Sequence, residues 1–407
     1  MDHQQILTDT RITEDGPGTI LRDFDALLDF VGVDGVETSG KYQLLPMKQL
    51  ATLNERLCQP IALDLKRPVQ KSYPPIQGLY LLLRVSGLAL PGKKGRKTVL
   101  RIDPEVLASW QGLNPTERYF ALLETWLFDM ESSLVDERAG SFQDASLDHW
   151  LHLREALGKG VANLDKNPEL RDRLPYYPGL HNLALMRLFG LLSLQEARPG
   201  PGEGWHIKSI HPTPFGDALL ARLQQEDLSR AIRGLSADND ETDDPMWFQS
   251  HFQRYFPELR HTLELPAQEF REGDHTLKVI LPNYCQARLR APGRATLMAL
   301  SSAILELVEF DDDHLHCFRY RDRLGEQLDV NHPYVDEGPY TDQTRLGDLD
   351  LREGQTLRYI FDFGDHWEFE ITVEGIDETA SSGTNSVEVL EFRGEKPTQY
   401  WGGEDEE

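Results

Sequence analysis

The sequence predicts an α+β protein of several domains, with a helical amino-terminal region and a mainly antiparallel sheet in the carboxy-terminal part. Its 407 residues exceed what one small module needs. Apolar residues recur at helical spacing in the first half, whereas apolar and polar residues alternate, as in strands, near the end. The charge also changes along the chain: residues 41–101 carry twelve basic and two acidic residues, and residues 271–407 carry 13 and 30. Two electrostatically opposite regions are expected in one chain.

The amino-terminal region shows helical patterns followed by a hairpin. Ile20–Phe30, Leu44–Leu57 and Tyr73–Val85 have apolar stripes at helical spacing. Gly87 ends the third helix, and Leu88–Ile102 predicts two short strands joined by a basic, glycine-containing turn. This order of helix, glycine and hairpin is winged-helix-like.

A second winged-helix-like unit is expected downstream. His181–Gly190 has a helical pattern, a hairpin pattern with a Pro/Gly-rich turn follows, and Pro214–Leu223 predicts the next helix. Between the two units, Asn114 is positioned to cap another helix. We expect a domain with a basic wing at 1–150, a second unit at 151–236, an acidic linker and connecting segment at 237–270, and an α+β domain with an acidic tail at 271–407. The linker assignment rests on five carboxylates between Ala237 and Pro245.

The last region predicts strands, a helix and further strands. His275–Leu281 and Cys285–Arg290 alternate around a turn, and Thr296 is placed to cap the helix Leu297–Val308. An aromatic-faced hairpin is expected to pack on that helix and to be buried, because a soluble protein does not leave so large an apolar face in water. That face comprises Tyr359, Phe361, Phe363, Trp367, Phe369 and Ile371.

Three segments of this region resemble the plasmid pRiA4b open-reading-frame-three-like family, whose members are also labelled passengers of insertion elements. The segments are Asp312–Phe318, Tyr359–Glu368 and Arg393–Tyr400, and the earlier stretches Leu65–Pro74 and Leu113–Phe120 look like longer members of the family. The resemblance implies a long member with an amino-terminal extension and an association with mobile elements or defence loci. No established activity comes with the family name.

Four residues of the resembling segments form a candidate metal site. His314 and His316 would project from one face of a strand, and Asp365 and His366 on the hairpin turn would add ligands for a divalent metal. The alternative is that these polar groups fix the hairpin by hydrogen bonds. Carboxylates on the other face of the hairpin could also bind Mg²⁺ or act as acid and base, although such a face is usually solvated. These carboxylates belong to Asp362, Glu368 and Glu370.

The basic turn is the candidate binding surface. A hairpin with several cations can contact phosphates while a nearby helix enters a groove, or it can dock on an acidic protein, including the acidic domain of this chain. The residues proposed for this surface are Lys66, Arg67, Lys71, Lys93, Lys94, Arg96 and Lys97.

The sequence favours a non-enzymatic interaction or adaptor protein with a protein partner. A DNA-binding accessory factor is the first alternative, and a metal-dependent hydrolase or nuclease is the second. No Gly-rich phosphate loop, Gly-x-Ser-x-Gly elbow or Cys/His nucleophile pair is present, and no cofactor is expected. Three cysteines without metal-site spacing, no signal-peptide profile and no long apolar run predict a cytoplasmic protein without a membrane partner.

Overall fold

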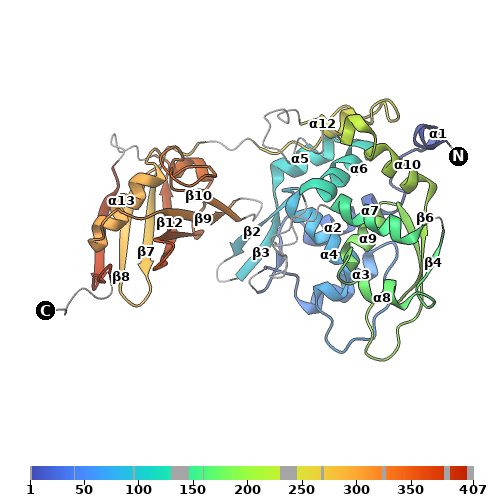
Figure 1. Ribbon diagram of the computed structural model, residues 1–407, viewed down its shortest axis with the longest axis horizontal. Helices are drawn as coiled ribbons and strands as arrows, with labels where there is room; N and C mark the ends of the chain where they lie inside the picture. The colour runs from blue at the N-terminus through green and yellow to red at the C-terminus, as the bar shows by residue number, and fades with distance from the viewer. Residues whose placement is uncertain are drawn as a thin grey trace. The chain divides into compact units, whose positions relative to one another are not determined.

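The computed structural model describes nine stretches of the chain, which fall into two compact units, Met1–Pro266 and Ala267–Glu407 (Figure 1). The protein is α+β: the first unit is helical with small sheets, and the second contains a seven-stranded antiparallel sheet. No helix among the described residues has the length and apolarity to cross a bilayer. The described residues are 2–40, 42–94, 97–129, 146–158, 160–229, 245–266, 270–322, 327–379 and 386–400.

The first unit repeats one order of elements: helix, short strand, two helices and a hairpin. Each set forms a three-stranded sheet in which the short strand pairs with the second hairpin strand, giving the orders β1-β3-β2 and β4-β6-β5. A helix that begins with proline follows each hairpin. The first set is α2 (Ile20–Val31), β1 (Val36–Glu37), α3 (Met47–Arg56), α4 (Pro74–Val85), β2 (Ala89–Lys94), β3 (Lys97–Ile102) and α5 (Pro104–Gly112). The second set is α7 (Ser146–Leu157), β4 (Ala162–Asn163), α8 (Pro168–Arg173), α9 (Leu180–Leu188), β5 (Leu192–Glu196), β6 (Ile207–Pro212) and α10 (Pro214–Leu223).

Glycine ends the third helix of each set in the same way. Gly87 after α4 and Gly190 after α9 both have a φ of 74°, a left-handed conformation that glycine adopts without steric cost. The chain therefore leaves each helix directly into a hairpin. Asp103 caps α5 and Thr213 caps α10 through side-chain oxygens that accept backbone N–H groups.

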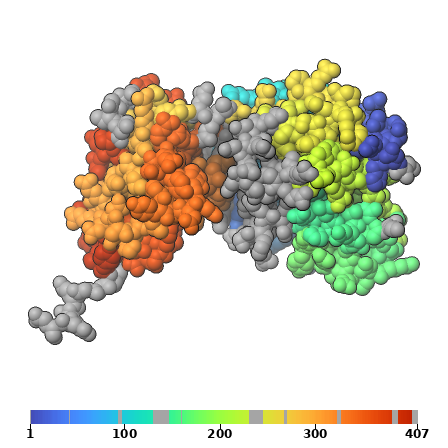
Figure 2. Space-filling model, turned by 45° about the horizontal axis from the view of Figure 1, so that its top comes forward, coloured from blue at the N-terminus to red at the C-terminus, as the bar shows by residue number. Residues whose placement is uncertain are grey.

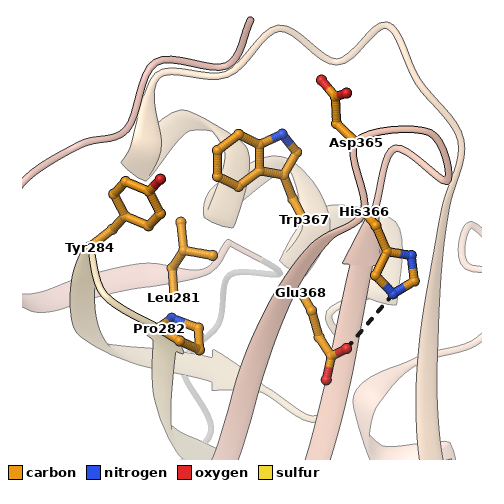
Figure 3. A pocket seen from close by; sticks show the side chains of 7 residues that line it. All are labelled: Leu281, Pro282, Tyr284, Asp365, His366, Trp367 and Glu368. Atoms are coloured by element: carbon orange, nitrogen blue, oxygen red, sulfur yellow. Dashed lines mark ion pairs between the residues drawn. The ribbon is translucent and has the colours of Figure 1, made fainter. Parts of the chain in front are cut away.

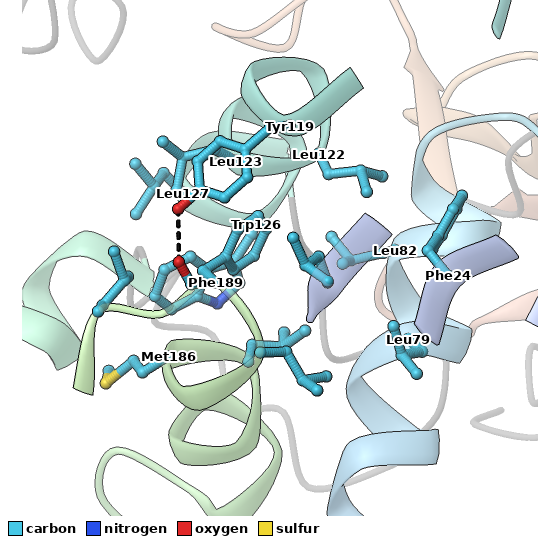
Figure 4. Close-up of a cluster of buried hydrophobic side chains, with 14 of the residues drawn as sticks. Phe24, Leu79, Leu82, Tyr119, Leu122, Leu123, Trp126, Leu127, Met186 and Phe189 are labelled. Atoms are coloured by element: carbon cyan, nitrogen blue, oxygen red, sulfur yellow. Dashed lines mark hydrogen bonds between the residues drawn. The ribbon is translucent and has the colours of Figure 1, made fainter. Parts of the chain in front are cut away.

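Helices from both sets share one hydrophobic core. α4 packs against α9, and a Cβ at Gly78 would lie 2.7 Å from Cγ of Leu185. In the centre of this core, the Tyr119 hydroxyl donates a 2.6 Å hydrogen bond to the carbonyl of Phe189 (Figure 4). Tyr119 belongs to α6 (Pro115–Glu124), whose amino terminus has a capping box between Asn114 and Glu117, and which continues as a π-helix over Thr125–Asp129.

Three shorter elements complete the first unit. α1 (His3–Asp9) lies against α10 at the surface (Figure 2). A 3₁₀-helix covers Gln70–Ser72, immediately before α4, and α12 covers Trp247–Ser250. The domain boundaries expected at residues 150 and 236 stay predictions, and residues 237–244 of the expected linker lie outside the described part of the chain.

The second unit is one antiparallel sheet with a long helix on one face. Its strand order is β10-β9-β11-β12-β7-β8-β13, so the aromatic hairpin β11–β12 lies near the middle. Thr296 caps the helix α13 as expected, and the Ser301 and Tyr359 hydroxyls are 2.6 Å apart between helix and sheet. The elements are β7 (Asp274–Leu281), β8 (Cys285–Pro292), α13 (Leu297–Val308), β9 (His316–Arg321), β10 (Gln327–Asn331), a 3₁₀-helix (Leu346–Leu349), β11 (Thr356–Phe361), β12 (Trp367–Asp377) and β13 (Glu388–Gly394).

The aromatic face of the hairpin is buried as predicted, except at Phe363. Five of the six expected side chains lie in the core with α13, whereas Phe363 is 48% exposed. The reason is local: β11 ends at Phe361, and Asp362 turns the backbone with a φ of 53°. The strand alternation therefore stops before Phe363.

Candidate functional site

The predicted hairpin carries most of the basic residues proposed for binding. β2 and β3 pair from Ala89 with Ile102 to Lys94 with Lys97, which confirms the predicted hairpin, whereas residues 95 and 96 between the strands lie outside the described part of the chain. Lys97 is exposed and forms an ion pair with Glu37 on the neighbouring strand β1. The hydrogen bond that Lys97 donates within this ion pair lowers the pKa of the Glu37 carboxyl. The side chains of Lys93 and Lys94, and all of Arg96, lie outside the described part of the chain.

The other three predicted cations lie just before α4. Lys66 and Arg67 are exposed in the segment that leads to the 3₁₀-helix, and Lys71 is exposed within that helix. Two backbone hydrogen bonds hold the loop between β5 and β6 against Asp64. The Asp64 N–H donates to the Glu203 carbonyl at 3.0 Å, and the Gly202 N–H donates to the Asp64 carbonyl at 3.0 Å. The loop of the second hairpin is therefore held against the segment that precedes Lys66.

His316 lies inside the second unit, with no exposed surface. Its Nε2 is 3.1 Å from Oγ1 of Thr341, and its ring centroid is 4.8 Å from that of His332. Burial and the neighbouring His332 lower the pKa of His316 to about 4. The residue begins β9, which pairs with β11 as predicted.

His314 lies two residues earlier and contacts other groups. Its Nε2 is 3.5 Å from Oδ2 of Asp362 and 3.7 Å from Oδ1 of Asp313. The Tyr400 hydroxyl donates a 2.5 Å hydrogen bond to Oδ2 of Asp313, which raises the pKa of Tyr400 to about 12 and lowers that of Asp313. We call Asp313, His314, Asp362 and Tyr400 the Asp–His–Tyr cluster.

Gln399 fixes the carboxy-terminal segment beside this cluster. Its side-chain oxygen accepts the Asp311 N–H at 2.6 Å, and its amide nitrogen donates to the Asp311 carbonyl at 3.1 Å. The amide also lies 3.3 Å from Oδ1 of Asp313. Segments almost ninety residues apart are therefore held together by a compact set of polar contacts. The arrangement is well suited to fixing the fold at this end of the sheet.

The turn between β11 and β12 is fixed by Asp362 and not by Asp365. Oδ1 of Asp362 accepts the N–H groups of Gly364 at 2.8 Å and of Asp365 at 3.3 Å, which is an Asx-type turn. The alternative that these polar groups fix the hairpin by hydrogen bonds therefore does not hold for Asp365, because Asp362 accepts the turn amides. The Asp365 carboxylate is exposed and has no hydrogen-bond or ion-pair partner among the described residues.

The structure does not bring the four predicted metal ligands together. His316 is buried and contacts Thr341, His314 contacts Asp313 and Asp362, and Nε2 of His366 lies 3.8 Å from Oε2 of Glu368. Within the described stretches, no group of three or more His, Cys, Asp or Glu side chains is placed to hold a metal ion. Of the outer-face carboxylates, Glu368 contacts an arginine, with its Oε1 3.1 Å from Nη1 of Arg358, and Asp362 contacts His314.

A hollow of about 370 Å³ lies at the same end of the sheet, between the β7–β8 turn and the β11–β12 turn (Figure 3). Trp367 and Tyr284 form its aromatic part, with ring centroids 5.9 Å apart. The hollow is lined by Leu281, Pro282, Tyr284, Asp365, His366, Trp367 and Glu368.

The comparison with known families bears on this second unit. Residues 276–406 match the model of the plasmid pRiA4b ORF-3-like protein family. The carboxy-terminal domain belongs to this family. About 275 residues precede the pRiA4b ORF-3-like domain and lie outside the match, as expected for a long member.

The other comparisons add no function. No curated protein matches the chain. A crystal structure of a protein of unknown function from Methanosarcina mazei is similar at 22% identity, covering 32% of this chain and 75% of that one, with a TM-score of 0.29. The Asp–His–Tyr cluster and the hollow are both built from residues of the pRiA4b ORF-3-like domain.

The sequence did not indicate Tyr284, Asp313 or Gln399 as site residues. Tyr284 lies in the turn between β7 and β8. It reaches Trp367 because β12 pairs with β7, and the local sequence does not reveal this strand order. Gln399 lies in a family-like segment, and that membership was the only signal for it. The contacts that join these residues depend on the tertiary structure.

Proposed function

We propose that the chain is a non-enzymatic interaction protein that binds an acidic protein partner through the basic hairpin β2–β3. The observation that carries this proposal is the burial of α4. Each of its twelve residues is buried, from Pro74 to Val85. We further propose that each repeated set in the first unit is a winged-helix-like module, supported by the element and strand orders.

The burial of α4 favours a protein over a DNA groove. In helix-turn-helix proteins, the recognition helix places its side chains on base edges and must be exposed. α4 is the helix that precedes the basic hairpin, and it packs against α9 with Gly78 facing Leu185. The cations of the hairpin can contact phosphates, and phosphate contacts do not read bases.

Charge complementarity suggests an acidic partner. The stretch 41–101 has a net charge of +10, whereas the whole chain carries −26 and is repelled by a polyanion at long range. A partner with a short acidic segment can approach the basic surface locally with less repulsion than a duplex. The mobile-element association remains a proposal that rests on the family name.

A direct test compares two labelled probes by fluorescence anisotropy: a twelve-residue Glu/Asp-rich peptide and a duplex DNA of about 20 base pairs. At about 150 mM salt we expect the full chain to bind the peptide at least about tenfold more tightly than the duplex. The triple variant Lys93→Glu/Lys94→Glu/Lys97→Glu should lose peptide binding. The control Lys166→Glu/Arg171→Glu/Lys208→Glu makes the same change in charge at exposed positions of the second set and should retain it.

Tighter binding of the duplex, with an affinity that falls steeply with salt and is lost in the hairpin variant, would establish the DNA-binding alternative. Equal loss in both triple variants would show that net charge, and not the hairpin, controls binding.

A further inference from the structure

We propose that the hollow between the β7–β8 and β11–β12 turns binds a lysine or arginine side chain presented by a peptide segment of a partner protein. This site belongs to the pRiA4b ORF-3-like domain and is independent of the function proposed for the basic hairpin. Its geometry combines an aromatic wall with a carboxylate and a buried donor that have no partner among the residues that the structure describes (Figure 3).

The buried donor is the indole nitrogen of Trp367. The residue is 9% exposed, and Nε1 is buried without a hydrogen-bond partner in the described part of the chain. Its ring is held in place by Phe310, at a centroid distance of 5.0 Å, and by Tyr284. In Figure 3 the nitrogen faces the side of the hollow on which Asp365 lies. Because buried N–H groups are almost always paired, this nitrogen points to a ligand that brings an acceptor, such as a peptide carbonyl.

The unpaired carboxylate belongs to Asp365. It is displayed at the tip of a turn whose backbone is fixed by Asp362, so its position does not depend on a partner of its own. Glu368, on the other side of the hollow, is already paired with Arg358 and His366. Asp365 is therefore the group available to a cation.

The remaining lining suits the side chain of a basic residue. Leu281 and Pro282 offer apolar contact to the methylene stem, and the faces of tyrosine and tryptophan attract an ammonium or guanidinium group. The domain around the hollow carries a net charge of −17 over residues 271–407, which favours the approach of a basic segment. An acidic ligand would be repelled by the Asp365 carboxylate and by the negative charge of the domain.

The test uses the full chain labelled with ¹⁵N at its tryptophan indoles, whose Trp367 signal is assigned with Trp367→Phe. The probe is the pentapeptide Gly-Gly-Lys-Gly-Gly with blocked ends, and the matched probe carries norleucine in place of lysine. We expect the lysine peptide to shift the Trp367 signal saturably at concentrations up to about 10 mM, and the norleucine peptide to leave it in place.

The variant Asp365→Asn should lower the affinity for the lysine peptide by about fivefold, which corresponds to the loss of one exposed ion pair. The control Glu378→Gln removes an exposed carboxylate just beyond the far end of β12 and should leave the affinity unchanged. Asp365 is exposed, so its replacement leaves the core intact.

Each of the following results would overturn the proposal: equal shifts with the norleucine peptide, a Trp367 signal that does not move, or equal weakening in both carboxylate variants. Butylammonium serves as a further probe, because it has the cation without the peptide carbonyl. We expect it to bind more weakly than the peptide, and binding of equal strength would identify the hollow as a site for small amines and contradict a peptide ligand.

Discussion

His316 lies in the core of the pRiA4b ORF-3-like domain, where water cannot solvate its charged form. Its ring packs near His332 and Tyr359, and its Nε2 is close to the Thr341 hydroxyl. These surroundings keep the imidazole neutral, with a pKa of about 4 in the folded protein against 6.5 for the unperturbed side chain. The unfolded chain therefore takes up a proton at higher pH than the folded chain does.

This difference predicts a pH-dependent stability. The contribution of neutral His316 is fully present above pH 6.5 and is lost as the pH falls toward 4, because the unfolded state binds the proton first. The loss is up to about 3 kcal/mol in the free energy of unfolding. Urea unfolding between pH 4.5 and 7.5 measures it. Since other groups titrate in the same range, the informative quantity is the difference from His316→Gln.

We expect the stability of His316→Gln to fall less steeply with pH than that of the unchanged protein. Parallel stability curves for the two proteins would mean that His316 does not titrate differently in the folded and unfolded states.

At the residue level, the sequence located the polar groups but not their surroundings. His314 and His316 share a strand-like spacing, which predicted a shared face. In the structure β9 begins only at His316, so the alternation does not extend back to His314. The two imidazoles differ in burial, because His316 is buried and His314 is not. Burial depends on which helix and loops cover the strand, and the local sequence pattern does not show that.

At the scale of elements, the contact between α4 and α9 holds the two repeated sets together. The contact is close because residue 78 has no side chain: a Cβ there would lie 2.7 Å from Cγ of Leu185 and 3.1 Å from both of its methyl groups. Gly78→Val should destabilise the protein by about 1–3 kcal/mol, because the added methyl groups overpack the core. Thermal or urea unfolding of the full chain measures this change.

Gly112→Ala is the matched control. Gly112 is the last residue of α5, and a Cβ there would meet nothing within 4 Å. Alanine favours helix more than glycine does, so this variant should be neutral or slightly stabilised. A Gly78→Val variant as stable as the control would mean that α4 and α9 do not require this close approach.

The predicted elements match well where a repeated pattern and a punctuating residue coincide. The hairpin after Gly87, the helix Pro214–Leu223 and the helix capped by Thr296 were all expected. The two-residue strands β1 and β4 were not, because two residues give no alternation to detect. These strands complete the two small sheets, so the repeated topology became visible only through pairing.

In the molecule as a whole, basic and acidic residues are divided between the two units. The basic residues concentrate in the first helical set, and the acidic residues concentrate in the pRiA4b ORF-3-like domain. The sequence predicted this division directly, because charge can be counted along the chain. It did not predict that α4, the helix before the basic hairpin, would be buried along its whole length, since the pattern over Tyr73–Val85 indicated only an apolar stripe.

On the proposed function, the basic hairpin contacts an acidic protein while α4 stays inside the core. Hydrogen–deuterium exchange of the full chain, measured alone, with the Glu/Asp-rich peptide and with the duplex, tests both parts of this proposal. We expect the peptide to slow exchange in β2 and β3, the duplex to slow none, and the amides of α4 to exchange slowly in every sample because the helix is buried. Fast exchange of α4 in the free protein, together with protection of α4 by the duplex, would contradict the claim and identify α4 as a DNA-contacting helix.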